Sequence, residues 1–384
     1  MSGDRRSVTR RTRGVVAAVG VTLGLAACGS TAPVASGPPA NAISVRSTAD
    51  ECSLSASTAP AGPTAFRVVN AADHPTEVSV YAADGARVVG QVDDVGPAAA
   101  RDLTVVLTAG TYTVACTPGQ SGESIRAALT VTGATTAATG DLAELTRAVT
   151  AYETWVSAQA ARLDSGTAAF VAAVRAGDLA AAKALYAPTR ANWERIEPVA
   201  SSFRDLDLRL DARDQDLEDT ASWTGWHRLE KAMWVDGSLA GMEPVAAQLL
   251  TDTRDLVARI DGVSLTIEQV TNVAKELVEA VASSELSGGE ELYSHTDLWD
   301  FQANIEGARE SWNVVSAYVA VRDPVLGKAI ELGFVDLQSE LDRHRRGDGF
   351  GLYPELAEPD IRILAAKVES LSEPLSRLTA TVFS

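Results

Sequence analysis

Residues 223–234 read WTGWHRLEKAMW and are the most informative stretch of the 384-residue chain, because they indicate a helix with a buried polar pair. The spacing predicts a helix whose inward stripe carries His227 and Glu230 between two tryptophans, because residues three or four apart share a face. An imidazole and a carboxylate that face a core are costly to bury unless their charges are compensated. A bound cation would compensate them. The alternative is a core histidine whose hydrogen-bond partner is that glutamate.

Residues 141–384 have the periodicity of an all-α bundle. Apolar residues at spacings of three and four between Leu298 and Val319 mark one core-facing helical stripe. All seven tryptophans lie in this half of the chain. Helices are expected near 141–164, 167–176, 178–187, 189–208, 214–235, 243–261, 266–286, 296–321, 325–346 and 359–382.

Residues 43–132 have a β pattern, in which short β-branched segments alternate with turn residues. About seven such strands predict a small β-sandwich, and the small residues at 133–140 predict a linker to the helical half. The clearest segments are 66–70, 77–81, 103–107, 111–116 and 127–131.

Residues 1–42 are predicted to be a targeting segment and a tether. A basic start is followed by an apolar run at 15–27 that is too short to span a bilayer. The run ends in LAAC, which resembles a bacterial lipoprotein processing site, so residues 1–27 should be removed and Cys28 lipidated. Residues 28–42 then form a flexible tether outside the cytoplasm. The alternative is an ordinary secretory signal with a chance cysteine.

The net charge of −18 limits the partners of this chain. Strong acidity argues against nucleic acid and against anionic membrane surfaces, so the lipid anchor is the only membrane attachment we expect. It favours cations instead.

Cys52 and Cys116 are the cysteines that remain after Cys28. In an oxidising compartment a disulfide between them is the default. The alternative is an atypical metal site formed by Cys116, Cys52 and Glu77. A blue-copper centre needs two histidines and a cysteine, whereas His74 is the sole histidine of residues 43–132.

Further carboxylates lie near the predicted inward faces. Asp297 and Asp300 belong to a run rich in nitrogen and oxygen ligands, although an aspartate at a helix start is also stabilised by the helix dipole. Glu197 borders a buried face, whereas Glu194 looks solvated. One imidazole with several carboxylates suits iron, manganese or zinc. Copper is a further option for the bound ion.

The motif Gly-x-His-x-x-Glu, supplied by Gly225, His227 and Glu230, resembles the mark of the imelysin-like domain family. Further similar segments are 181–190, 194–198, 225–231 and 293–307. The chain as a whole is similar to bacterial iron-uptake components that join a cupredoxin-like β domain to an imelysin-like helical domain.

This resemblance implies that His227 and Glu230 ligate a metal, completed by Asp297 and Asp300. It also implies iron as the ion, ferrous or ferric, with a membrane iron permease and a haem peroxidase as partners. Ser79 stands where some members carry a second carboxylate, which puts a metal site in the β domain in doubt.

The same family was first grouped with peptidases, so a metallopeptidase is the rival hypothesis. Hydrolysis needs an open metal position and a general base beside the bound water. In zincins a glutamate follows the ligand histidine, whereas Arg228 follows His227 here. The sequence therefore favours a binding protein over an enzyme.

Overall fold

The computed structural model describes residues 42–83, 85, 87–119, 124–133, 139–217 and 222–383. The expected signal peptide, the lipidation site at Cys28 and nearly all of the tether lie outside these residues. Within the described part of the chain, no helix combines the length and the apolar character needed to cross a bilayer.

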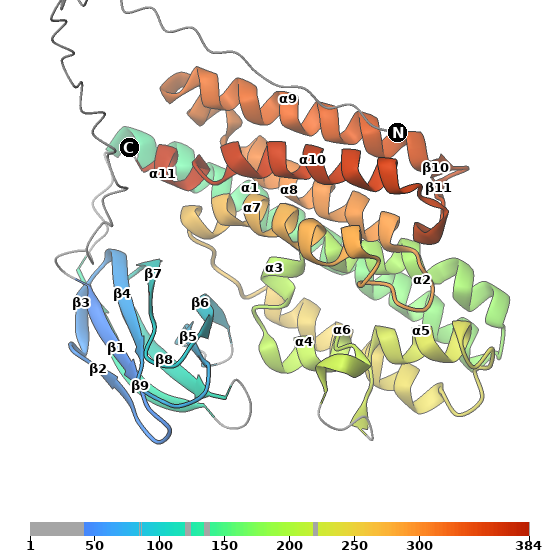
Figure 1. The fold of residues 1–384 in the computed structure, drawn as a ribbon, viewed down its shortest axis with the longest axis horizontal. Helices are drawn as coiled ribbons and strands as arrows, with labels where there is room; N and C mark the ends of the chain where they lie inside the picture. The colour runs from blue at the N-terminus through green and yellow to red at the C-terminus, as the bar shows by residue number, and fades with distance from the viewer. Residues whose placement is uncertain are drawn as a thin grey trace, which may run out of the picture. The chain divides into compact units, whose positions relative to one another are not determined.

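The first half is a two-sheet β structure, as predicted (Figure 1). One sheet has the strand order β2-β1-β4-β7 and the other β3-β9-β8-β5-β6. Pairs β1–β4 and β3–β9 are parallel, and the other pairs are antiparallel. The strands are β1 (Ile43–Ser47), β2 (Cys52–Leu54), β3 (Thr58–Pro60), β4 (Gly62–Asn70), β5 (Thr76–Tyr81), β6 (Val88–Val95), β7 (Ala100–Leu107), β8 (Gly110–Pro118) and β9 (Ile125–Thr132).

A disulfide joins Cys52 on β2 to Cys116 on β8 and so links the two sheets. Both cysteines are buried and belong to the same apolar cluster as Val45, Val68 and Val114. Of the two alternatives for these cysteines, the structure takes the disulfide. A sulfur in a disulfide is not a thiolate and cannot serve as the expected metal ligand. The structure therefore contradicts the alternative of a metal site formed by Cys116, Cys52 and Glu77.

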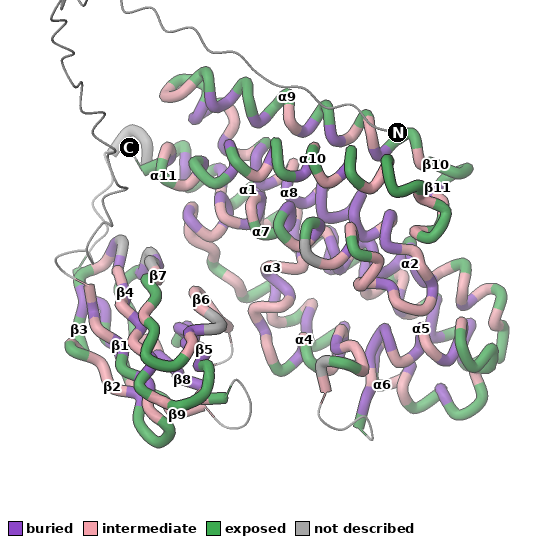
Figure 2. The backbone as a smooth tube through the Cα atoms, in the orientation of Figure 1, coloured by how far each residue is buried: buried purple, intermediate pink, exposed green. Residues whose placement is uncertain are grey.

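The second half is a helical bundle, which confirms the predicted order of a β region followed by an α region. Helix α1 packs against α2 and α6, α7 against α8, and α9 against α10. Buried residues face the centre of this bundle (Figure 2). The helices are α1 (Thr139–Arg175), α2 (Leu179–Glu194), α3 (Glu197–Ala200), α4 (Arg204–Leu210), α5 (Trp226–Trp234), α6 (Glu243–Ile260), α7 (Ile267–Ser283), α8 (Asp297–Arg322), α9 (Pro324–Leu341), α10 (Glu358–Leu375) and α11 (Leu378–Val382).

Several helix boundaries differ from the prediction. Helix α1 continues through Gly166, where a Cβ atom would lie 2.7 Å from the Thr189 side chain, so this glycine permits close packing of α1 on α2 and does not break the helix. Pro188 lies inside α2 and does not end it. The expected helix 189–208 is divided instead into the end of α2, α3 and α4. The predicted stop and restart near residue 178 is confirmed, because Asp178 caps α2 by accepting from the Ala181 N–H at 3.0 Å.

Candidate metal centre

Gly225 sets the start of helix α5 and thereby the position of His227. Its φ is +88°, and a Cβ atom there would lie 2.4 Å from the carbonyl oxygen of Leu210. Only glycine fits this close approach of two backbones. The helix therefore begins at Trp226, well inside the expected helix 214–235, and the Trp223 indole lies outside it and donates to the Ala212 carbonyl at 2.7 Å.

His227 and Glu230 lie together on the buried face of α5, as the spacing predicted. His227 Nδ1 donates to Glu230 Oε2 at 3.0 Å. The other oxygen of Glu230 accepts from the backbone N–H groups of Tyr293 at 2.9 Å and Ser294 at 2.7 Å. Glu230 therefore holds the imidazole in one orientation, as carboxylates behind metal-bound histidines commonly do.

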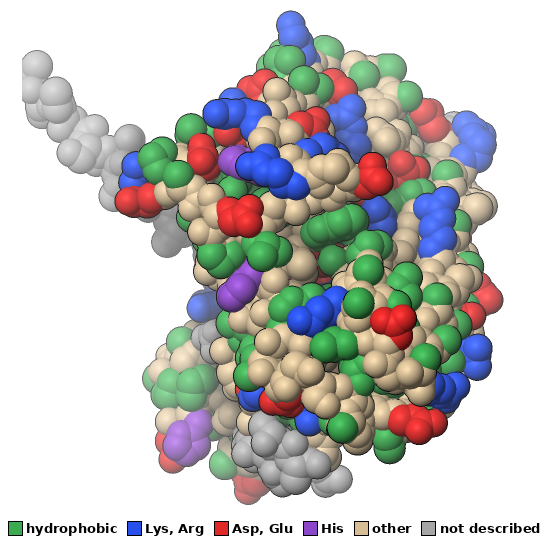
Figure 3. Space-filling model, turned by 90° about the vertical axis from the view of Figure 1, so that its right-hand side faces the viewer, with side chains coloured by type: hydrophobic (Ala, Val, Ile, Leu, Met, Phe, Trp, Pro, Cys, Tyr) green, Lys and Arg blue, Asp and Glu red, His purple; other side chains and the backbone are tan. Residues whose placement is uncertain are grey.

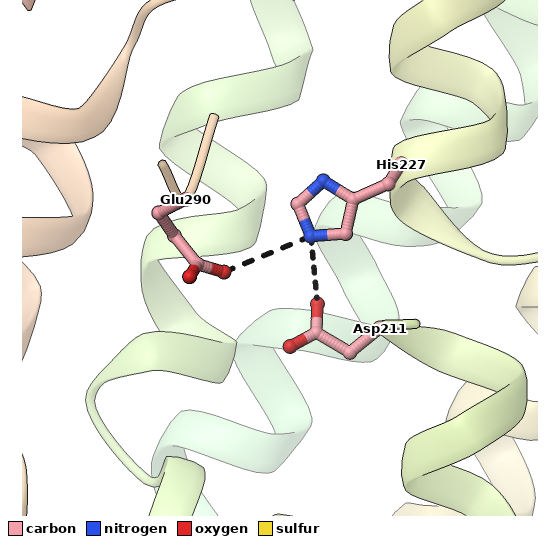
Figure 4. Close-up of side chains that lie close together, drawn as sticks. All are labelled: Asp211, His227 and Glu290. Carbon is pink, nitrogen blue, oxygen red and sulfur yellow. Dashed lines mark ion pairs between the residues drawn. The ribbon is translucent and has the colours of Figure 1, made fainter. Parts of the chain in front are cut away.

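The Nε2 atom of His227 points toward two carboxylates (Figure 4). It lies 3.6 Å from Asp211 Oδ1 and 3.7 Å from Glu290 Oε1, and it has no hydrogen-bond partner within the described part of the chain. The His227 side chain is 1% exposed. Ligand atoms bound at about 2.1 Å to one ion lie roughly 3–3.5 Å apart. The three atoms thus surround a position suited to a metal ion.

Two loops supply the carboxylates of this triad. Asp211 directly follows α4, and Glu290 lies between the short 3-10 helix Glu285–Ser287 and α8. Both side chains are 13% exposed, which makes them the outer edge of the site. On the face drawn in Figure 3, acidic and basic side chains are interspersed. The carboxyl groups nearest His227 are instead buried or nearly so: Glu230 and Glu291 are 0% exposed, and Asp211 and Glu290 are 13% exposed.

Arg190 on α2 lies behind the triad and is completely buried. Its Nη2 is 2.8 Å from Glu194 Oε1 and 2.6 Å from Glu290 Oε1. Its Nη1 contacts Asp211 Oδ1, and its Nε contacts Glu291 Oε1. One guanidinium is thus shared by four carboxyl groups, and Arg213 Nη1 adds a second cationic contact to Glu290, at 3.0 Å from Oε2.

More buried acceptors lie deeper among the helices. Asn304 on α8 donates to Glu285 Oε1 at 2.7 Å and to Glu194 Oε2 at 3.2 Å. Asp300 is buried, and neither of its oxygens accepts a hydrogen bond from any residue that the structure describes. Burying acceptors without donors is unfavourable unless a proton or a cation satisfies them.

The pKa values show how these charges are distributed. Burial and Arg190 oppose protonation of His227, yet the carboxylates of Glu230, Glu290 and Glu291 raise its pKa to about 10. Burial acts to raise the pKa of Glu290, but contact with His227 and the charge of Arg190 hold it well below its usual range. Burial raises the pKa values of three deeper acids well above their usual range, with neighbouring carboxylates adding to the effect and Arg190 opposing it. These three are Glu194, Glu291 and Asp300.

Comparison with known proteins places the helical half in one family: the model described as Imelysin matches residues 148–378. The chain belongs to the imelysin family. It is 36% identical to the iron uptake system component EfeO of Escherichia coli over 362 residues, which cover 93% of this chain and 95% of that protein. EfeO of Shigella flexneri gives the same values.

A solved structure from Parabacteroides distasonis, named as an iron-regulated protein A precursor, is also similar. It has a TM-score of 0.50 and 15% identity, and the match covers 64% of this chain and 96% of that chain. At this identity the likeness shows the fold alone.

Three other carboxylates of this imelysin-family chain were expected as ligands: Glu197, Asp297 and Asp300. They are not among the atoms that the structure groups around His227 Nε2. Asp297 is buried at the start of α8, and its Oδ1 accepts from the Glu291 backbone N–H at 3.1 Å. Glu197 begins α3 with intermediate exposure. Burial, followed by the charges of Glu290 and Asp211, raises its pKa well above the usual range. Asp300 interacts electrostatically with Glu291 and with Arg190.

Glu77, the expected carboxylate ligand of the β domain, is paired with an arginine. Its Oε1 and Oε2 accept from Arg204 at 2.7 and 3.0 Å, and Ser79 Oγ donates to Oε1 at 2.8 Å. Both cysteines are in the disulfide, and among the described residues Glu77 belongs to no group of three possible metal ligands.

Sequence reasoning missed the residues that complete the site. Glu194 looked solvated, but it is buried because the end of α2 packs between other helices. Asp211 and Glu290 lie in loops, where no periodicity marks an inward side chain. Arg190 lies in one of the segments similar to the family, and that similarity was the available signal for its importance.

A separate group of possible ligands lies where α9 ends near the start of α10. Atoms of Glu340, His344 and Asp360 lie within 4.8 Å of one another. However, Arg343 Nη1 already donates to both Glu340 oxygens at 2.7 and 2.9 Å. Both Glu340 oxygens are therefore already satisfied, and the three residues of this cluster are only partly buried, whereas His227 is almost completely buried.

Proposed function

We propose that this chain is the iron-binding component of an extracytoplasmic iron-uptake system, and that Asp211, His227 and Glu290 hold the ion. One observation carries the proposal: a buried imidazole nitrogen faces two carboxylate oxygens at 3.6 and 3.7 Å, amid more acids than cations. Relatives named as iron uptake system component EfeO match 93% of the chain, which supports iron as the cargo.

The chemistry of these ligands supports the same cargo. One neutral imidazole and two carboxylates form a borderline-to-hard set that suits ferrous or ferric iron and also accepts zinc. Glu230 keeps Nδ1 protonated, so that the Nε2 lone pair would be the one offered to the ion. The site therefore binds through Nε2 and two oxygens, while Glu230 orients the ring.

The proposal extends to location and partners. An anchor at Cys28 would keep the protein at the membrane, where an iron permease takes the ion and a haem peroxidase acts in the same system. The relatives' name as components of an iron uptake system supports partners of this kind.

The metallopeptidase alternative is less favoured by the geometry. A hydrolytic metal needs an open position and a nearby base for the bound water. Both oxygens of Glu230 already accept hydrogen bonds, from His227 and from two backbone N–H groups, and Glu291 is paired with Arg190. Neither carboxylate is therefore free to act as that base. The His227 side chain is also too buried for a polypeptide to reach easily.

Metal titration of the mature chain tests the proposed function. Anaerobic calorimetry with ferrous iron, repeated with zinc and copper, should show one ion per chain at the triad. A peptide digestion assay on the same metal-loaded sample should show no turnover. Failure to bind iron would refute the function, and metal-dependent digestion would favour the peptidase.

Iron binding is expected to release protons and to become tighter as the pH rises. The pKa of about 10 means that His227 carries a proton at neutral pH, and ligation requires this proton to leave Nε2. The bound state therefore holds fewer protons, and affinity should rise about tenfold per pH unit for each proton released. Anaerobic ferrous titrations between pH 6 and 8, with a pH indicator in weak buffer, measure both quantities. Affinity that is constant over this range would contradict the assignment of His227.

A further inference from the structure

A cation already lies beside the proposed iron position. Arg190 Nη1 contacts Asp211 Oδ1, and its Nη2 lies 2.6 Å from Glu290 Oε1. These are the same two oxygen atoms that face His227 Nε2 at 3.6 and 3.7 Å. The guanidinium and an incoming metal ion would therefore compete for the same carboxylates.

We propose that Arg190 is a built-in counter-ion that competes with the cargo and limits how tightly the site holds it. This inference rests on the proposed function. When an ion binds, Arg190 keeps Glu194 and Glu291 and gives up Asp211 and Glu290.

The positions of the four carboxylates support this division. Glu194 lies one turn from Arg190 on the same helix, and Glu291 is completely buried against the guanidinium. Asp211 and Glu290 come from loops and form the exposed edge of the site, at 13% exposure each. The two outer carboxylates can thus turn toward an ion while the two inner ones keep their arginine.

The charge of Arg190 has two opposite consequences. It stabilises the metal-free protein, because buried carboxylates left without a cation are strongly unfavourable. It weakens cation binding, because a fixed positive charge nearby repels the ion in a medium of low dielectric constant. Arginine does not lose its proton in proteins, so this repulsion persists at any physiological pH. A carrier that must release its ion gains from such a permanent competitor.

The two consequences separate this proposal from a purely structural role. If Arg190 only held the site together, its removal would lower both the stability and the metal affinity. If it competes with the cargo, its removal lowers the stability but raises the affinity. The direction of the change in metal affinity is therefore decisive.

The test uses Arg190→Gln in the full mature chain, with zinc as a redox-inert probe measured by calorimetry and thermal unfolding. The variant is expected to melt at a lower temperature without metal, to bind zinc at least tenfold more tightly, and to show a larger zinc-induced rise in Tm. Arg190→Lys, which keeps the charge, should bind nearly as the wild type does. Arg195→Gln is the matched control, because Arg195 pairs with Glu306 at 2.7 Å outside the triad, and its zinc affinity should not change.

A second variant guards against loss of folding. Arg190→Gln combined with Glu194→Gln removes the arginine together with one of its two inner partners, so fewer buried acids are left without their cation. Asp211 Oδ1 and Glu290 Oε1 still lose their contact with Arg190, while the Arg213 contact at Glu290 Oε2 stays in place. It too should bind zinc more tightly than the wild type. Unchanged or weaker zinc binding in the folded variants overturns the proposal. A wild-type chain that binds neither zinc nor iron would instead refute the proposed function.

Discussion

Replacing His227 by alanine is expected to weaken iron binding at least tenfold, equivalent to about 1.4 kcal/mol or more. His227 Nε2 is the only nitrogen among the three atoms that face the proposed ion position. Its loss removes one of three ligands, and water must replace it. Trp226 and Trp234 lie on the same helix, so quenching of tryptophan fluorescence during an anaerobic ferrous titration would measure the affinity.

His74→Ala is the control for this experiment. His74 lies in the β region, and its side chain is 72% exposed beside Asp73. The substitution should therefore leave iron binding unchanged. Equal affinities for the wild type and the His227→Ala variant would show that the ion is held elsewhere.

Replacing Gly225 by alanine is expected to destabilise the protein by about 3 kcal/mol or more, because two costs add. Its φ of +88° with ψ of −168° is a conformation that is essentially restricted to glycine. The added Cβ would also lie 2.4 Å from the Leu210 carbonyl and 2.6 Å from that of Arg209. Relieving these contacts moves the start of α5 away from α4. His227 and Asp211 would then separate, and metal binding should fall together with stability.

Urea unfolding of the metal-free protein measures this effect, and Gly237→Ala provides the comparison. Gly237 also has a positive φ, of +61°, but no atom lies within 4 Å of its hypothetical Cβ. Gly237→Ala should lower the free energy of unfolding by only about 1 kcal/mol, the cost of placing alanine at a positive φ. Similar losses at the two positions would mean that the contact with α4 does not control the site.

Much of the architecture could be predicted from the chain itself. Alternating β-branched segments indicated the two-sheet region, and repeats of three and four indicated the bundle. Both signals are local, because they depend on which side of one element is buried. For the same reason the inward positions of His227 and Glu230 were predicted correctly, and the pairing of Cys52 with Cys116 was the default between the two alternatives.

Local signals failed where a residue's role depends on another segment. The expected helices stopped before Gly166 and before Pro188, but α1 and α2 run through these residues and pack against each other. Glu194 looked exposed because its burial comes from neighbouring helices. The position of Trp223 outside α5 follows from the contact of Gly225 with the end of α4.

The amino-acid pattern by itself determined a β region followed by a helical bundle with an inward imidazole and carboxylate. Only the tertiary structure decided what that imidazole faces: Asp211 and Glu290 from two loops 79 residues apart, with Arg190 behind them. Periodicity reports the burial of side chains along one helix. The convergence of loops that are distant in sequence depends on how whole helices pack, and no local pattern encodes it.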